Sequence, residues 1–234
     1  MKELDEYLQE NLHLTAKSVA AYIKGRWQIG YSERGATALL HRLGYVYKKP
    51  KLVPGKADAK AQLDFLEKYE QLKKDKQPDD LILFMDGVHP QHNPVMACGW
   101  IKRGVEFEIP SNTGRQRLNV NGAVNIDSLE TVCRFYDTIN GEATIDLCKA
   151  IEEHYPKAGT IYIICDNARY YRSKEVRNFL EGSRIELVFL PPYAPNLNLI
   201  ERYWKYFKKV VLYNHYYETF NEFKMACENF FSDQ

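Results

Sequence analysis

The sequence has no closely spaced cysteine pair, no long apolar run and no repeat, and each absence excludes a class of protein. Its five cysteines are odd in number and scattered, without a C-x-x-C pair. We therefore expect no zinc site or disulfide framework, and a reducing compartment. No stretch reaches about 18 apolar residues, and the start MKELDEYLQE has no apolar signal region, so neither a membrane span nor a secretion signal is expected.

Charge is equally uninformative for the whole chain, because 32 basic residues nearly balance 31 acidic ones over 234 residues. The distribution is uneven, however. Nine Lys or Arg residues lie between Lys24 and Lys60, against two acids, Glu33 and Asp58. A locally basic segment beside a near-neutral remainder indicates a part that faces a polyanion and a separate core.

The first 50 residues are predicted to form short helices. LTAKSVAAYIKGRWQ has apolar residues at helical spacing, and ERGATALLHRLG is a second amphipathic helix with Ser32 as its N-cap and Gly44 as its stop. YVYKKPKLVP then has the pattern of a strand with a basic end. Helix, turn, helix and basic strand outline a winged helix-turn-helix, with a plain three-helix bundle as the alternative.

The rest of the chain has an α/β pattern. LVPGKADAKAQ is a linker with Pro and Gly, followed by a charged helix over about 59–76. Strands come first and then alternate with helices, which predicts a mixed sheet flanked by helices. We expect strands at about 81–86, 96–102, 105–109, 119–126, 160–165 and 185–191, and helices at about 143–154, 172–181, 198–211 and 219–231. The expected divisions are 1–52 for the DNA-binding segment, 53–78 for the linker and charged helix, and 79–234 for the catalytic domain.

Two of the predicted strands end in an acid. LILFMD ends in Asp86 and TIYIICD ends in Asp166, and both apolar runs are typical of parallel strands buried on two faces. Ligands of open α/β sheets bind beyond the carboxyl ends of the strands. If the two strands are neighbours, about 4.8 Å apart, one divalent cation could bind both carboxylates and remove their mutual repulsion.

A third acid, Glu201, lies at the border of the apolar stripe of the helix in LPPYAPNLNLIERYWKYFKK. Lys205 and Lys208 are on the same side, where they suit phosphate oxygens. Each acid also has an ordinary alternative. Asp166 with Asn167 could make a turn, Asp86 with Gly87 could make another, and Glu201 could complete a capping box with Asn198.

An all-oxygen set of ligands suits Mg²⁺ or Mn²⁺ rather than zinc. Two such ions can activate a water or a 3′-hydroxyl and stabilise the leaving oxygen of an in-line displacement. Asp86, Asp166 and Glu201 together therefore indicate phosphodiester chemistry.

Three blocks of the sequence, FMDGVH, ICDNARYYRSKEV and LPPYAPNLNLIERYWK, resemble the DDE transposases of the mariner superfamily, in its bacterial insertion-sequence branch. The 34 residues between Asp166 and Glu201 match the spacing of that family. The resemblance covers about residues 80–215, and the N-terminal segment resembles the winged second half of the family's paired helix-turn-helix region.

The resemblance implies an RNase H-like catalytic domain with two Mg²⁺ or Mn²⁺ ions on Asp86, Asp166 and Glu201. It implies recognition of terminal inverted repeats in double-stranded DNA and cut-and-paste transfer into TA sites. We expect a homodimer in the bacterial cytoplasm, associated with the nucleoid. Asn167 would orient the second acid or touch the scissile phosphate.

The sequence departs from the family in places. Many relatives carry His where this chain has Tyr171, and Asp and Pro where it has Asn196 and Leu199. The first helix-turn-helix of the usual pair is expected to be missing. The alternative function is therefore a non-catalytic end-binding protein or repressor derived from a truncated transposase, and a further alternative is a general RNase H-like nuclease.

Several other residues are candidates for nucleic-acid contacts. Lys48, Lys49 and Lys51 form the basic wing, and Arg115 and Arg117 lie in the Gly-containing run SNTGRQRLN, either a phosphate-contacting loop or a solvated turn. His89 and His92 follow Asp86 closely, and phosphate or solvent contacts are more typical of such loop residues than metal binding. Trp100 is predicted to be a core residue.

Overall fold

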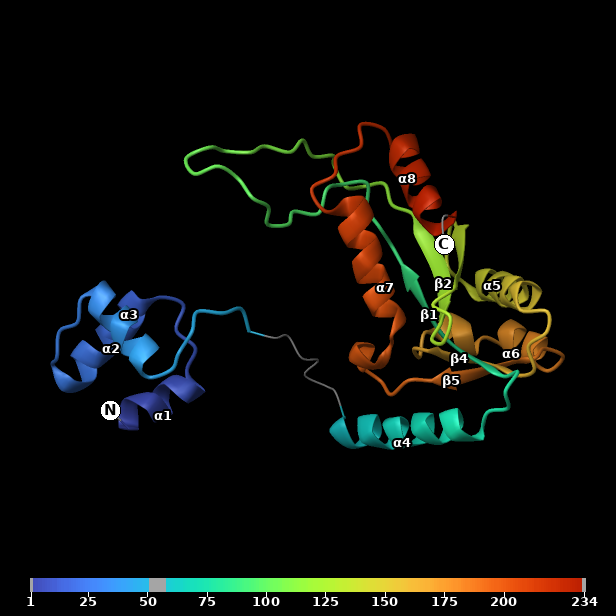
Figure 1. The fold of residues 1–234 in the computed structure, drawn as a ribbon, viewed down its shortest axis with the longest axis horizontal. Helices are drawn as coiled ribbons and strands as arrows, with labels where there is room; N and C mark the ends of the chain where they lie inside the picture. Colours follow the sequence, from blue (N-terminus) through green and yellow to red (C-terminus); the bar gives the residue numbers. More distant parts are fainter. Residues whose placement is uncertain (1, 51–57, 233–234) are drawn as a thin grey trace. The chain divides into compact units, whose positions relative to one another are not determined.

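The computed structural model describes residues 2–50 and 58–232, and it divides into two compact units, Met1–Val53 and Pro54–Gln234 (Figure 1). No helix among the described residues is both long and apolar enough to cross a bilayer.

The first unit consists of α1 (Lys2–Glu10), α2 (Ala16–Trp27) and α3 (Glu33–Arg42). Ser32 caps α3 as predicted, because its side chain accepts a hydrogen bond of 3.1 Å from the Gly35 N–H. Gly44 follows the helix with φ +85°, a backbone conformation that glycine adopts without strain. Buried apolar side chains from all three helices form the core of this unit: Leu4, Leu8, Val19, Ile23 and Leu39.

The strand predicted from Tyr45 does not form over residues 45–50, which is a correction. Tyr45 is instead held against the helices, since its N–H donates to the Leu40 carbonyl and its hydroxyl donates to Asp5 Oδ1 at 2.9 Å. No second strand exists among the described residues of this unit to pair with it. Lys51 and the rest of the predicted strand lie outside the described residues.

The second unit is built on a five-stranded mixed sheet in the order β3-β2-β1-β4-β5. Its strands are β1 (Leu81–Val88), β2 (Asn119–Asn125), β3 (Thr131–Tyr136), β4 (Ile161–Cys165) and β5 (Ile185–Phe189). The first three pair antiparallel, and β1 with β4 and β4 with β5 pair parallel. This confirms the predicted mixed sheet, and the two strands that precede the acids are neighbours, which is the condition for a shared cation.

Helices cover both faces of the sheet (Figure 1). One face packs on α5 (Gly141–His154) and α6 (Lys174–Leu180), through a core that includes Leu83, Ile163 and Leu147. The other packs on α7 (Ile200–Phe207) and α8 (Phe220–Ser232), with Phe65 of α4 (Ala59–Asp75) in the same core. The short helical segments are η1 (Arg169–Arg172), η2 (Pro195–Leu197) and the π-helical turn η3 (Lys208–Leu212).

Two helix boundaries and one strand differ from the prediction. The helix expected over 172–181 begins at Lys174, because the Ser173 hydroxyl accepts from the Val176 N–H and ends the 3₁₀ turn before it. The helix expected over 198–211 begins at Ile200 and continues from Lys208 as a π turn. Strand β3 was missed, although TVCRFY has the β-branched and aromatic residues of a strand.

The strands expected at 96–102 and 105–109 are absent, and this segment is part of a long excursion between β1 and β2. In Figure 1 it extends far from the sheet. A turn closed by the Val105 N–H and the Lys102 carbonyl reverses the chain, but the two arms do not pair as a ladder. The prediction of Trp100 as a core residue is wrong, because its side chain is fully exposed there.

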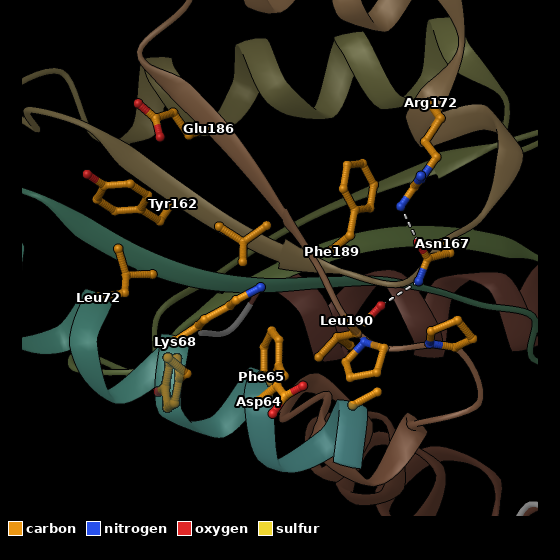
Figure 2. A pocket seen from close by; sticks show the side chains of 15 residues that line it. Asp64, Phe65, Lys68, Leu72, Tyr162, Asn167, Arg172, Glu186, Phe189 and Leu190 are labelled. Carbon is orange, nitrogen blue, oxygen red and sulfur yellow. Dashed lines mark hydrogen bonds between the residues drawn. The ribbon is translucent and has the colours of Figure 1, made fainter. Parts of the chain in front are cut away.

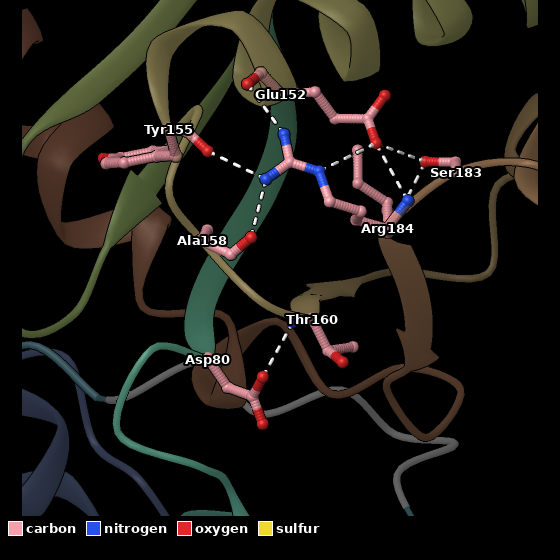
Figure 3. Close-up of polar contacts among 8 residues, drawn as sticks. Asp80, Glu152, Tyr155, Ala158, Thr160, Ser183 and Arg184 are labelled. Carbon is pink, nitrogen blue, oxygen red and sulfur yellow. Dashed lines mark hydrogen bonds and ion pairs between the residues drawn. The ribbon is translucent and has the colours of Figure 1, made fainter.

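The amino ends of three strands are fixed by a polar network (Figure 3). Beside the start of β5, Arg184 donates to the carbonyls of Glu152, Tyr155 and Ala158, at distances of 2.6 to 3.1 Å. Beside β1, Asp80 accepts from the N–H groups of Thr160 and Gln77, which lowers the pKa of its carboxyl. These hydrogen bonds at the amino ends of the strands hold the register of β1, β4 and β5. The carboxyl ends of the same strands stay open.

We predict that Gly122 of β2 is required for the packing of α7 on the sheet. A Cβ atom at this position would lie 2.6 Å from Cys133 Sγ and 2.8 Å from Trp204 Cη2. Gly122→Ala is therefore expected to lower the free energy of unfolding by about 1–3 kcal/mol, measured by urea denaturation. Gly182→Ala is the control, since nothing lies within 4 Å of the added atom. Equal stability of the two variants would contradict this packing.

Candidate active site

The alternation of side chains along β1 and β4 places two acids on one face. Leu83 and Met85 point to the α5 side, while Ile82 and Phe84 point to the α7 side, and Asp86 continues the latter series. The pairing of Phe84 with Ile164 has an offset of 80 residues. The same offset places Asp166 level with Asp86, on the face that α7 covers.

Asp86 is not in a turn, because it lies inside β1 and pairs with Gly122 of β2. The turn alternative for Asp86 is therefore wrong. For Asp166 the turn does form, since Oδ1 accepts a 2.9 Å hydrogen bond from the Ala168 N–H. That contact leaves Asp166 exposed at the end of β4, so a turn and an accessible carboxylate coexist.

Glu201 stands exposed in the first turn of α7, and the capping box proposed as its alternative role is absent. The N-cap position is Leu199, which has no side-chain capping bond. The Asn198 side chain instead donates to the carbonyl of Met85 at 3.2 Å. This bond ties the start of α7 to β1 one residue before Asp86.

The three predicted acids line one cavity of about 510 Å³. Its wall is completed by the segments that follow β4 and β5 and by the start of α7. The full lining is Asp86, Asp166, Asn167, Ala168, Leu190, Pro191, Pro192, Tyr193, Ala194, Pro195, Asn198 and Glu201. No Lys, Arg or His occurs among these described residues.

The electrostatics of this cavity are those of uncompensated anions. The pKa of Asp86 is raised to about 7, chiefly by burial and also by the nearby carboxylates of Glu201 and Asp166, while the Gly87 N–H partly offsets these effects. An aspartate with a pKa of about 7 is protonated in part of the molecules near neutral pH. A bound cation would remove the repulsion that favours the proton.

Oxygen donors of this kind fit a hard divalent cation. Two aspartates and a glutamate are the ligand types that Mg²⁺ and Mn²⁺ prefer. As placed, no three His, Cys, Asp or Glu side chains in the described part of the chain are grouped so that they could hold a metal ion. The fit therefore rests on donor chemistry and on the shared cavity, in which Asp166 and Glu201 are exposed.

Two further buried polar atoms flank Asp86 without a partner, Asn198 Oδ1 and Trp204 Nε1. The indole N–H is close enough to lower the pKa of Asp86, but it makes no hydrogen bond of normal geometry. In the sequence, Trp204 belongs to the apolar stripe of the helix that carries Glu201, and Asn198 is the candidate capping residue. Nothing in their spacing signals that both meet the end of β1.

Asn167 has its side-chain amide fully engaged. Its Nδ2 donates to the Leu190 carbonyl, and its Oδ1 accepts from Arg172 Nη2. The amide thus fixes the rim of the cavity rather than contacting Asp166. Arg172 was missed, although Arg169, Arg172, Lys174 and Arg177 form a basic run directly after the second acid.

None of the described basic residues predicted to contact nucleic acid is among the residues that line the acid-lined cavity. Lys205 is exposed on α7 and Lys208 is half-buried in the π turn, and neither lines the cavity. Arg115 and Arg117 are exposed on the excursion before β2, next to Gly114 with φ +67°. The other members, Lys48 and Lys49, are exposed after α3 in the first unit.

Three residues of undecided role have structural contacts. His92 is buried, with Nε2 2.8 Å from the Tyr217 carbonyl and its ring stacked on Phe223. His89 is exposed, with Nδ1 2.8 Å from Asn119 Oδ1. Tyr171 is buried in the core, and burial raises the pKa of its hydroxyl well above the usual value. Tyr171 is therefore unsuited to proton transfer at neutral pH.

Two family models match the chain. One described as DDE superfamily endonuclease matches residues 81–224, and one described as winged helix-turn-helix matches residues 10–69. A 39 kDa uncharacterized protein of insertion element IS630 from Shigella sonnei is 24% identical over 135 residues, which are 57% of this chain. The matched part is 39% of that relative's length.

The fold is also similar to solved structures. The Mos1 transposase paired-end complex with the left transposon end has a TM-score of 0.73 at 16% identity, over 100% of this chain and 71% of that one. A Mos1 mariner paired-end complex with Mn gives the same score, identity and coverage. The RNase H-like transposase fold expected from the sequence is confirmed.

We predict a pH-dependent stability from Asp86 in the metal-free protein. Its folded-state pKa of about 7 exceeds the ordinary 3.8, so its contribution is fully present below pH 3.8 and is lost as pH rises through about 7. Asp86→Asn should therefore be more stable than wild type at pH 8, by at most about 4 kcal/mol, and nearly equal near pH 4. Urea denaturation at both pH values measures this, with exposed Asp137→Asn as the control. Identical stabilities at pH 8 would mean that Asp86 is well solvated.

Proposed function

We propose, from the premise that the chain belongs to the DDE superfamily endonucleases, that it is a DNA transposase. It would cut DNA at the ends of a mobile element and transfer the freed strand into target DNA. The observation that carries the proposal is the single cavity lined by Asp86, Asp166 and Glu201, which holds no compensating cation among its described lining residues.

In this proposal the three acids hold Mg²⁺ or Mn²⁺, in two ions. When bound, these supply Lewis-acid activation of the attacking and leaving oxygens of an in-line displacement at phosphorus. Asp86 would hold a cation as the deprotonated carboxylate, because a nearby positive charge lowers the pKa of a carboxyl. Asn167 and Arg172 keep the rim in place, so that the scissile phosphate meets a fixed edge beside Asp166.

The DNA partners follow from the same premise. The helical first unit, with exposed Lys48 and Lys49, would bind the terminal inverted repeats, and the second unit would act on the ends and on TA target sites. Arg115, Arg117, Lys205 and Lys208 would contact phosphates outside the acid-lined cavity. We propose a homodimer that works at the bacterial nucleoid in the cytoplasm, because two element ends must be cut and joined together.

The alternative of a non-catalytic end-binding protein or repressor is less well supported. Decay of catalysis would release the selection on the acids, yet all three are present and reach the same cavity. Burial of Asp86 beside two like charges also costs stability, which a purely DNA-binding protein has no reason to retain.

We predict that Asp166→Asn abolishes metal-dependent cleavage of DNA that carries the element ends, while binding of that DNA survives. The change removes a cation ligand at an exposed position and keeps the side-chain volume. Gel analysis of cleavage and a mobility-shift assay measure the two effects, with Asp137→Asn as the exposed-acid control. Cleavage by Asp166→Asn at the wild-type rate would refute the assignment of the acids.

A second prediction concerns binding by the first unit. Affinity for end DNA should fall steeply as salt rises, because phosphate contacts release counterions. Replacing both Lys48 and Lys49 by Ala should reduce the slope of log affinity against log salt by about 2, one for each lost contact. Lys2→Ala, at the first residue of α1, is the control. An unchanged slope would remove these lysines from the DNA contact.

A further inference from the structure

A second cavity, of about 870 Å³, lies between α4 and strands β4 and β5 (Figure 2). Its floor is the sheet face at Tyr162 and Val188, and its sides come from Phe65, Lys68 and Tyr69 of α4. Both walls belong to the second unit. The helix therefore covers this face of β4 and β5 only in part.

The two cavities share a wall. Asn167, Leu190, Pro191 and Pro192 line both the acid-lined cavity and this one. The wall is fixed, because the Asn167 amide bridges the Leu190 carbonyl and the Arg172 guanidinium. A strand whose phosphate lies at Asp166 can therefore continue over this rim into the second cavity.

The lining combines cations with aromatic faces. Figure 2 shows the Lys68 amine and the Arg172 guanidinium extending into the cavity from opposite walls. Arg172 Cζ lies over the Phe189 ring, 4.1 Å from its centroid, so a cation–π contact holds the guanidinium beside the cavity. Tyr162 is half-buried on the floor. Such faces stack on nucleobases, while a lysine amine binds phosphate.

Two acids, Asp64 and Glu186, also line the cavity. Both are exposed, and they balance the charges of Lys68 and Arg172. A site for free phosphate would not carry them, because they repel an anion. Carboxylates do suit the amino groups of bases, so the lining as a whole matches one nucleotide with its base and its phosphate.

We propose that the cavity between α4 and strands β4 and β5 receives an unpaired nucleotide of the DNA strand that passes through the acid-lined cavity, a role that rests on the proposed transposase function. The base stacks against Tyr162 and the Arg172 plane, and its phosphate meets Lys68. A duplex is too wide for a cavity of this size, so the nucleotide must leave its base pair. Arg172, which is exposed and follows the second acid by six residues, is the basic residue that lines this cavity beside the shared wall.

The test measures binding of a short fluorescein-labelled oligothymidylate to the full chain by anisotropy, in EDTA, so that neither metal nor cleavage is needed. Tyr162→Leu should weaken binding about tenfold, which corresponds to the loss of one stacked base. Lys68→Met should lower the slope of log affinity against log salt by about 0.7. The control is Lys74→Met on the same helix, because Lys74 is exposed and does not line the cavity.

Location is tested by photocross-linking with an oligothymidylate that carries one iodouracil. Adducts should map by mass spectrometry to Tyr162 or Tyr69. Adducts confined to residues 2–50, or equal affinity of the two cavity variants and the control, would overturn the proposal. No binding at all by wild type would also overturn it.

These outcomes are separable from the proposed function. A chain that cuts no end DNA but binds the oligothymidylate in this cavity would keep the nucleotide site and lose the transposase role. A chain that cuts end DNA while Tyr162→Leu and Lys68→Met bind the probe like wild type would lose only the nucleotide site. Thermal unfolding of each variant confirms that the fold is intact.

Discussion

The parallel pairing of β1 with β4 decides where the chemistry of this protein can take place. Its offset brings Asp86 and Asp166 level at the carboxyl ends of the two strands, and the alternation of side chains turns both toward α7. Glu201 can then reach the same cavity because Trp204, one turn further along, packs on the face of the sheet at Gly122. A slip of one residue in this pairing would turn one acid to the opposite face.

The two ends of the sheet differ in electrostatic design. At the amino ends, Asp80 and Arg184 have their polar groups satisfied by backbone partners, and the pKa of Asp80 is lowered. At the carboxyl ends, Asp86 is half-buried beside like charges and its pKa is raised. The first arrangement stabilises the register of the strands. The second costs stability in the absence of a cation, as is common where side chains are kept for function.

Much of the fold was predictable, since the apolar strands ending in acids and the amphipathic helices carry periodic signals in the sequence. The misses have physical causes. Residues 96–109 alternate like a strand, but the chain provides no partner edge for them, so Trp100 is exposed. Tyr45 begins a strand-like run, yet its hydroxyl and N–H bonds hold it against α1 and α3. Both errors arise because strand pairing is a long-range property that a local pattern cannot contain.

The sequence by itself determined which residues are candidates for the chemistry, because an acid that ends a buried apolar run and a glutamate beside a helical stripe are local patterns. Only the tertiary structure decided how they meet. Segments that are far apart in the chain meet through the pairing offset of β1 and β4 and through the hydrogen bond from Asn198 to Met85. The Trp204 N–H is also buried there, without a partner. The cavity beside α4 is of the same kind, since Lys68, Tyr162 and Arg172 become neighbours only when the helix packs on the sheet. Contacts between distant segments depend on packing and register, and neither leaves a periodic trace along the chain.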